Sequence, residues 1–160
     1  MNKLNVTIEN AAIAHKGADE KGRKLLEDLF GKEHFTPKPI TERVKSFEDA
    51  CWVLDMEPDD VLPYSEDTTD KEEININAYA KLKTIAKALN EGWVPDFSHG
   101  NQAKYYPWLK SNGSGLGLSF FGCGDGRSDS NVGSRLYYKT AELAKYAGTQ
   151  FIKIYNQFNN

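Results

Sequence analysis

Apolar residues spaced three and four positions apart predict amphipathic helices in the first half of the chain. One helix is expected over 19–30, because Asp19 can cap its start and Gly31 can end it. A second helix starts near Thr41 and ends near Asp55, and its apolar stripe faces the core. That stripe consists of Val44, Phe47, Cys51 and Leu54, with Ala50 beside it.

The middle of the chain combines an acidic segment with a further helix. Residues 57–73 are rich in acidic residues, Pro, Ser and Thr, a composition typical of an exposed, mobile loop. Asn75 or Asn77 then caps a helix that stops at Gly92. The lysines expected to point outward from this helix are Lys81, Lys83 and Lys87.

The pattern changes near residue 93, where glycine and aromatic residues become frequent. Three short apolar runs, at 104–110, 117–123 and 134–140, are separated by Asn, Asp and Gly and predict a three-stranded antiparallel β-meander. Pro107 places the first strand at an edge or a bulge, because proline cannot donate a hydrogen bond to a sheet. Thr140 caps a C-terminal amphipathic helix that packs on the sheet. The predicted fold is therefore α+β, with a helical N-terminal half.

Length and composition favour a single domain over residues 1–160, with a helical part at about 9–92 and the meander plus last helix at about 93–160. A chain of this length builds a core without disulfides, so Cys51 and Cys123 are expected to be free thiols. No apolar run reaches the ~20 residues of a membrane span. The first residues do not follow the pattern of a secretory signal, and we expect a cytoplasmic protein.

The charges are divided between the two halves of the chain. Residues 1–73 hold 10 basic and 18 acidic residues, a net charge of −8, whereas 74–160 hold 10 basic and 5 acidic residues, a net charge of +5. The halves can neutralise each other by packing together, or the charges can solvate separate faces. Alternatively, the basic half contacts an anion such as nucleic acid.

Nine aromatic residues between Trp93 and Tyr138 mark the best candidate surface. Neighbouring residues of a strand point to opposite faces, so each aromatic doublet of the predicted meander leaves one ring outside. Three such rings would form a platform for stacked bases, unless helices cover both faces of the sheet. The basic residues near enough to hold phosphates are Lys104, Lys110, Arg127, Arg135 and Lys139. The candidate contact residues are Trp93, Tyr105, Tyr106, Trp108, Arg127, Arg135 and Tyr137.

Motifs for catalysis, metals and phosphate loops are weak. The three histidines lie in separate regions, without a Cys, Glu or second His at ligand spacing. A helix-turn-helix pattern at 46–62 is cut short by Pro63. The glycines at 113, 115 and 117 suit a hairpin, and Asp129, Asn131 and Gly133 suit a turn better than a calcium loop. We expect no catalytic residue, cofactor or metal, and a hydrolase acting near His99 or Asp125 stays an open alternative.

Several stretches resemble a known group of proteins. They are KLLEDLFGK (24–32), ERVKSFEDAC (42–51), YYPW (105–108), GSRL (133–136) and AELAKYAGTQF (141–151). Together they resemble small uncharacterised proteins encoded by phages, prophages and mobile elements of Bacteroidetes. This resemblance implies a phage or mobile-element protein in the bacterial cytoplasm or in the virion, and it implies no activity.

The functional expectation is a non-enzymatic accessory protein that binds a protein partner through its aromatic and basic surface. Trp, Tyr and Arg are the residue types enriched at binding hot spots. The alternative is single-stranded nucleic-acid binding by the aromatic sheet. The sequence leaves the oligomeric state open.

Overall fold

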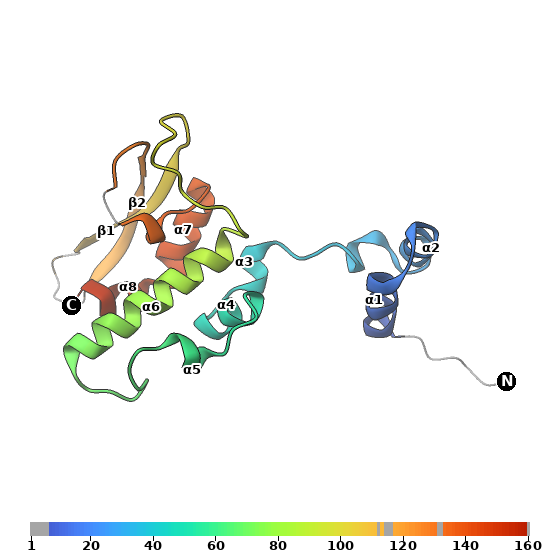
Figure 1. The fold of residues 1–160 in the computed structure, drawn as a ribbon, viewed down its shortest axis with the longest axis horizontal. Helices are drawn as coiled ribbons and strands as arrows, with labels where there is room; N and C mark the ends of the chain where they lie inside the picture. The colour runs from blue at the N-terminus through green and yellow to red at the C-terminus, as the bar shows by residue number, and fades with distance from the viewer. Residues whose placement is uncertain (1–6, 112, 114–116, 131–132, 160) are drawn as a thin grey trace. The chain divides into compact units, whose positions relative to one another are not determined.

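The structure is a computed structural model that describes residues 7–111, 113, 117–130 and 133–159 (Figure 1). It divides into two compact units, Met1–Pro39 and Ile40–Asn160. Each unit is described by itself below. The single domain expected from the length stays a prediction.

The N-terminal unit contains two helices, α1 (Ile8–Gly17) and α2 (Glu20–Phe30), and a short 3₁₀ turn, η1 (Lys32–His34). Asp19 caps α2 by accepting a hydrogen bond from the backbone N–H of Gly22, and Gly31 ends the helix at φ 89°, as the sequence predicted. Contacts that join the described parts of this unit include a 3.0 Å hydrogen bond between His15 Nε2 and Glu27 Oε1 and the stacking of His15 on Phe35, with 4.4 Å between ring centroids.

The helices of the C-terminal unit differ from the expected ones in their boundaries. The predicted helix over 41–55 is divided into α3 (Ile40–Arg43) and α4 (Phe47–Val53). The break is caused by Ser46, whose side chain accepts from the N–H of Asp49 while the Asp49 carboxylate accepts from the N–H of Ser46. This reciprocal capping box starts a new helix at that point.

The acidic segment is more regular than a plain loop. It contains α5 (Pro58–Val61), and α6 (Lys71–Leu89) begins within it. Asp70 caps α6 through the N–H groups of Glu72 and Glu73, so the predicted start at Asn75 or Asn77 is wrong. Asn77 has another role, because its buried amide bonds to both the N–H and the C=O of Tyr64. That amide anchors the middle of the acidic segment to α6.

The sheet has two antiparallel strands, β1 (Lys104–Ser111) and β2 (Leu118–Gly126). The predicted third strand is wrong: its residues form η2 (Ser134–Leu136) and a single bridge between Tyr105 and Tyr138. Tyr105 exchanges both backbone hydrogen bonds with Tyr138, at 3.0 and 2.7 Å. The next β1 residue on that edge is Pro107, which has no N–H to donate, so the pairing stops there.

The chain ends in two helices, α7 (Ala141–Gln150) and α8 (Ile152–Asn159), in place of the single one expected. Both of them pack against the strands, and α6 packs against α8 and α4 (Figure 1). A side chain at Gly148 of α7 would come within 2.6 Å of Pro107 Cβ, so only glycine allows this close packing. The core combines buried residues of α3, α4, α6, α7 and α8 with Leu136 and Tyr138.

A buried hydroxyl pair lies inside this core, where Tyr138 and Tyr155 place their oxygens 3.1 Å apart. Burial raises the pKa of Tyr138 well above its ordinary value, and the adjacent Tyr155 hydroxyl adds to this effect. Burial also raises the pKa of Tyr155. Both phenols are therefore neutral at physiological pH.

The fold is α+β, with a helical N-terminal half, a two-stranded sheet and C-terminal helices. Among the residues that the structure describes, no helix has the length and apolar character needed to cross a membrane.

Candidate functional site

A groove of about 530 Å³ lies beside the C-terminal half of α6 and is bordered by the segments 93–95 and 135–137. Its volume is within the range of small-ligand and peptide-anchor pockets, about 300 to 1,000 Å³. We call it the basic groove. Its lining residues are Met56, Lys83, Thr84, Lys87, Asn90, Trp93, Val94, Pro95, Arg135 and Tyr137.

Asn90, the C-cap of α6, holds the two walls of the basic groove together. Its buried side-chain amide donates to the C=O of Tyr137 at 2.8 Å and accepts from the N–H of Lys139 at 2.9 Å. Both bonds join the end of α6 to the segment that carries Arg135. Because a buried backbone group without a partner is costly, Asn90 fixes the distance between the walls.

A tight turn after α6 brings Trp93 to the groove. Glu91 and Gly92 adopt positive φ values of 48° and 86°, and the N–H of Trp93 then donates to the C=O of Asn90 at 3.0 Å. The turn leaves the Trp93 ring half-buried and Val94 exposed. The wall opposite the lysines is therefore apolar.

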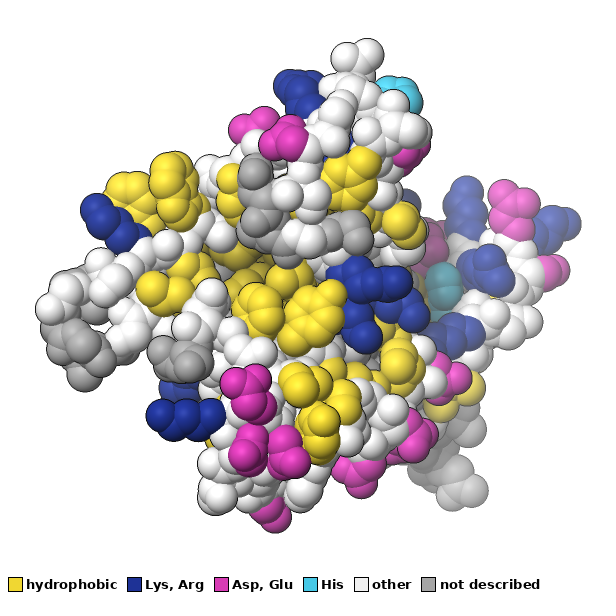
Figure 2. Space-filling view, turned by 60° about the vertical axis from the view of Figure 1, so that its left-hand side comes forward, with side chains coloured by type: hydrophobic (Ala, Val, Ile, Leu, Met, Phe, Trp, Pro, Cys, Tyr) yellow, Lys and Arg dark blue, Asp and Glu magenta, His cyan; other side chains and the backbone are white. Residues whose placement is uncertain are grey.

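The groove is positively charged. Lys83 and Lys87 are one helical turn apart on α6, so they share a face, and Arg135 faces the same cavity from η2. None of the ion pairs formed within the described ranges involves these three side chains. Figure 2 shows Lys and Arg side chains gathered directly beside an apolar patch. This combination suits an anion that is attached to an apolar group.

Three of the predicted contact residues, Trp93, Arg135 and Tyr137, come together in the basic groove. Tyr137 is only 1% exposed, and its ring packs edge-on against Phe97 and Tyr106 at 5.7 and 5.6 Å. It therefore supports the groove from below, whereas Trp93 and Arg135 present accessible groups.

The other predicted contact residues lie elsewhere. Trp108, 57% exposed, packs edge-on against Phe121 of β2 at 5.9 Å, on the hairpin. Tyr105 and Tyr106 are half-buried, and Arg127 is exposed and donates weakly to the C=O of Asn101 at 3.5 Å. The seven candidates therefore do not form one surface.

The aromatic doublets do not form a platform of three outward rings, which agrees with the alternative in which the sheet is covered. Tyr137 and Tyr138 are both buried, and Tyr105 and Tyr106 are both half-buried. Only the third doublet leaves one ring outside: Phe120 is half-buried and Phe121 is 62% exposed. Lys104, expected to hold a phosphate, is fully buried and donates to the carbonyls of Gln102 and Arg127 at 2.8 and 2.6 Å.

Lys83 and Lys87 are the functional candidates that sequence reasoning missed. Their outward orientation was expected, but they were not included among the candidate contact residues. The sequence did contain a signal for them. Lys83 and Lys87 are four residues apart, so they share one face of the helix, and the aromatic Trp93 follows shortly after the helix ends.

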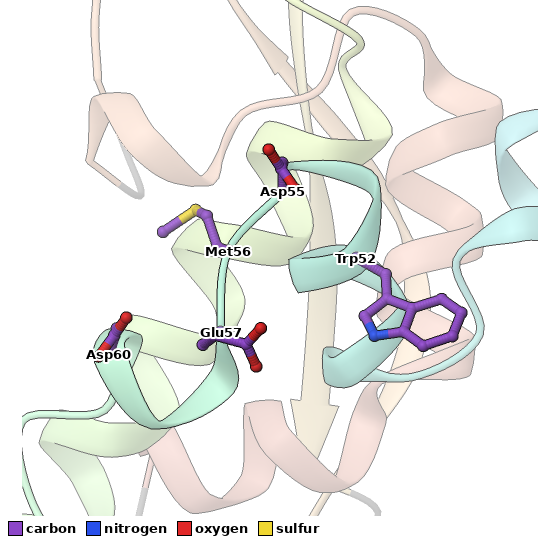
Figure 3. A pocket seen from close by; sticks show the side chains of 5 residues that line it. All are labelled: Trp52, Asp55, Met56, Glu57 and Asp60. Carbon is purple, nitrogen blue, oxygen red and sulfur yellow. The ribbon is translucent and has the colours of Figure 1, made fainter.

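A second hollow, of about 500 Å³, lies around the end of α4 and has the opposite charge. Figure 3 shows its lining residues, with the Trp52 indole pointing away from the carboxylates of Asp55 and Asp60. Trp52 is 84% exposed. Met56 lines both this hollow and the basic groove, so the two cavities adjoin.

The described residues give little support to catalysis. His99 and Asp125 are exposed and line neither cavity. Burial raises the pKa of the Cys51 and Cys123 thiols, which keeps them in the less nucleophilic protonated form. No group of three or more His, Cys, Asp and Glu side chains in the described part of the chain is placed to hold a metal. Two residues of the weak motifs, Gly115 and Asn131, lie outside the described residues.

Comparison of the chain with protein-family models, curated proteins and solved structures finds no match. The site therefore has to be interpreted from its own geometry.

Proposed function

We propose that this protein is a non-enzymatic binding module and that the basic groove receives an acidic segment of a protein partner. The observation that carries this proposal is the arrangement of Lys83, Lys87 and Arg135 opposite the apolar wall of Trp93 and Val94. A peptide with carboxylates beside an apolar anchor matches both walls. Tryptophan and arginine are also the residue types that dominate binding energy at protein interfaces.

A protein partner is favoured over a single-stranded nucleic acid by the surroundings of the groove. Beyond Met56, a phosphate chain would meet the carboxylates of Asp55, Glu57 and Asp60 in the adjoining hollow. Repulsion between these carboxylates and the phosphates would oppose the binding of a long polyanion. Nucleic-acid binding stays the second candidate, because Trp93 and three cations also suit one or two stacked nucleotides.

The proposed biological setting is a phage or mobile element, as the resemblance of the five quoted stretches implies. An accessory protein of this kind would act in the host cytoplasm or in the virion by engaging a protein partner. Partner identity would come from the experiment that follows.

The test is capture from a bacterial host lysate with the full chain as bait, with and without nuclease, at low and moderate salt. We expect an acidic protein to be retained after nuclease treatment and to be lost with the variants Arg135→Ala and Lys87→Glu. Trp108→Ala is the matched control, since this exposed ring lies outside the groove. Capture that survives Arg135→Ala and Lys87→Glu but fails with Trp108→Ala would overturn the groove and point to the hairpin. Retention that disappears with nuclease would favour the nucleic-acid alternative.

A further inference from the structure

The hollow at the end of α4, which we call the acidic hollow, combines one exposed aromatic ring with several carboxylates. Its lining residues are Trp52, Asp55, Met56, Glu57 and Asp60 (Figure 3). The Trp52 ring is 84% exposed, and the three acidic side chains are exposed as well. Carboxylates beside an apolar anchor are the ligand features that match the basic groove. The chain therefore carries a ligand of this kind on its own surface.

The end of α4 holds this ligand in a defined conformation. The backbone N–H of Met56 donates to the C=O of Cys51 at 3.0 Å, and Asp55 adopts a positive φ of 55°. Both features are typical of a Schellman helix end, in which the first residue after the cap is left-handed. Pro58 then starts α5 with a fixed φ. A ligand that is ordered in advance loses little conformational entropy on binding.

The acidic hollow and the basic groove adjoin, but their charges do not pair within one chain. Met56 lines both cavities. Among the ion pairs that the structure gives for its described ranges, none joins a carboxylate of the hollow to a cation of the groove. Both sets of charges therefore stay available to a second molecule.

We infer that the acidic segment received by the basic groove belongs to a second copy of this chain, an inference that rests on the proposed function of the groove. A two-fold axis beside Met56 exchanges the two cavities, so the acidic hollow of each copy faces the basic groove of the other. Carboxylates then meet cations at both contacts, whereas like charges stay on opposite sides of the axis. Trp52 of one copy is the apolar group opposite the wall of Trp93 and Val94 in the other.

The arrangement of charge favours a second copy over another partner. A nucleic acid or a uniformly acidic protein would meet the carboxylates of the acidic hollow where it extended past Met56. A second copy avoids this repulsion, because it brings carboxylates to the groove and cations to the hollow at the same time. One molecule therefore satisfies both cavities.

The first test is analytical ultracentrifugation of the full chain over a range of micromolar concentrations, at low and moderate salt. We expect a dimer whose dissociation constant rises with salt, since salt screens interface charges. The groove variant is Lys87→Glu with Arg135→Glu. The hollow variant is Glu57→Lys with Asp60→Lys, which leaves the left-handed residue at position 55 unchanged. Each variant places like charges opposite each other and should weaken its own dimer by about 100-fold or more.

An equimolar mixture of the groove variant and the hollow variant should restore the dimer. In the mixed pair, the acidified groove of one copy faces the basic hollow of the other, and the unchanged groove faces the unchanged hollow. The matched control is Lys145→Glu with Lys153→Glu, which changes the net charge as the groove variant does at exposed sites outside both cavities. This control should dimerise as the wild type does.

The second test removes the aromatic anchor and changes no charge. Trp52→Ala should raise the dissociation constant of the dimer by about 30-fold or more. Trp108→Ala is the control, because this exposed ring of the hairpin lines neither the acidic hollow nor the basic groove, and it should leave the constant unchanged. Circular dichroism of each variant monitors its helix content.

A wild-type chain that stays monomeric across the concentration range would overturn the inference. A dimer that tolerates the groove variant would do the same, and so would two charge variants that do not recover on mixing. The proposed function fails separately: a monomeric chain that still captures an acidic host protein through Lys87 and Arg135 keeps the groove as a binding site and excludes only the second copy. Recovery specific to the mixture would establish the pairing of hollow and groove.

Discussion

The two units of the chain differ most in how they bury apolar side chains. In the C-terminal unit, residues from segments far apart in sequence, including α4, α6 and α7, share one core, and buried hydrogen bonds join them. In the described part of the N-terminal unit, a pair of short helices surrounds one buried alanine, and α2 has no buried residue.

This contrast shows that regular, well-capped helices do not by themselves make a stable unit. Both helices have a side-chain cap, Asp19 for α2 and Ser46 for α4. Of the two, only α4 adds its apolar face to a shared core. The free energy of unfolding should therefore respond to changes in the C-terminal unit and be nearly insensitive to the same changes in α2. The predictions below test that difference.

The largest effect is expected from equivalent leucine truncations in the two units. Leu82→Ala, in the fully buried middle of α6, should lower the free energy of unfolding by about 2 to 5 kcal/mol because it leaves a cavity. Leu29→Ala, in α2, which has no buried residue, should change it by less than about 0.5 kcal/mol. Urea denaturation followed by tryptophan fluorescence measures both. Equal losses of unfolding free energy in the two variants would show that the two units do not differ in how they bury these leucines.

Asn90→Ala should lower the free energy of unfolding by about 1 to 3 kcal/mol, because it removes two buried hydrogen bonds, the one to the C=O of Tyr137 and the one from the N–H of Lys139. Asn90→Asp keeps the acceptor for Lys139 but places a buried carboxylate oxygen against the C=O of Tyr137, so it should lower the free energy of unfolding at least as much. Both variants should also weaken capture by the basic groove, since Asn90 joins its walls. Full stability of Asn90→Ala in thermal denaturation would show that these two bonds do not connect the walls.

Alkaline pH should act on the C-terminal unit through its buried phenols. The folded pKa values of Tyr138 and Tyr155 are raised, so the folded state holds these protons more tightly than the unfolded chain does. Their contribution is fully present below the unfolded pKa of about 10 and is lost as pH rises above it, by about 1.4 kcal/mol per pH unit for each tyrosine. Denaturation midpoints measured from pH 8 to 11 should fall. Tyr155→Phe should flatten the slope, and an unchanged slope would exclude this pair as its source.

The smallest effect is expected from a matched pair of helix caps. Ser46→Ala removes one half of the capping box of α4 and should lower the free energy of unfolding by about 1 kcal/mol. Asp19→Ala removes the cap of α2 and should lower helicity without shifting the main unfolding transition. Circular dichroism and tryptophan fluorescence, recorded on the same samples, separate the two effects. A shift of the main transition by Asp19→Ala would couple α2 to the core.

Helix existence was predictable from the sequence, because its signals are local. Asp19 and Gly31 bound α2, and Thr140 caps α7, as expected from residues a few positions apart. The absence of a third strand was not predictable. The segment 134–140 has the composition of a strand, but its structure depends on Pro107 of another strand and on the burial of both Tyr137 and Tyr138. These determinants lie far away in the sequence or depend on tertiary packing.

The candidate site was predictable only in part. The aromatic and basic composition directed attention to Trp93 and Arg135, which do line the basic groove. It could not separate accessible side chains from buried ones, so Tyr137 and Lys104 were included with residues that face solvent. The composition also missed Lys83 and Lys87. These lysines line a groove only because the turn at Glu91 and Gly92 folds the following segment back along α6.

The reactivity of Lys104 would report how often the C-terminal unit unfolds locally. Its ammonium group is enclosed by two carbonyl oxygens and the Phe97 ring, 5.1 Å from the nitrogen, and the side chain has no contact with solvent. An amine-reactive reagent should label the exposed Lys87 and Lys110 quickly. It can reach Lys104 only after the base of the hairpin separates. The rate at which this one lysine becomes acylated would therefore record, in living cells as in the test tube, how often the C-terminal unit comes apart.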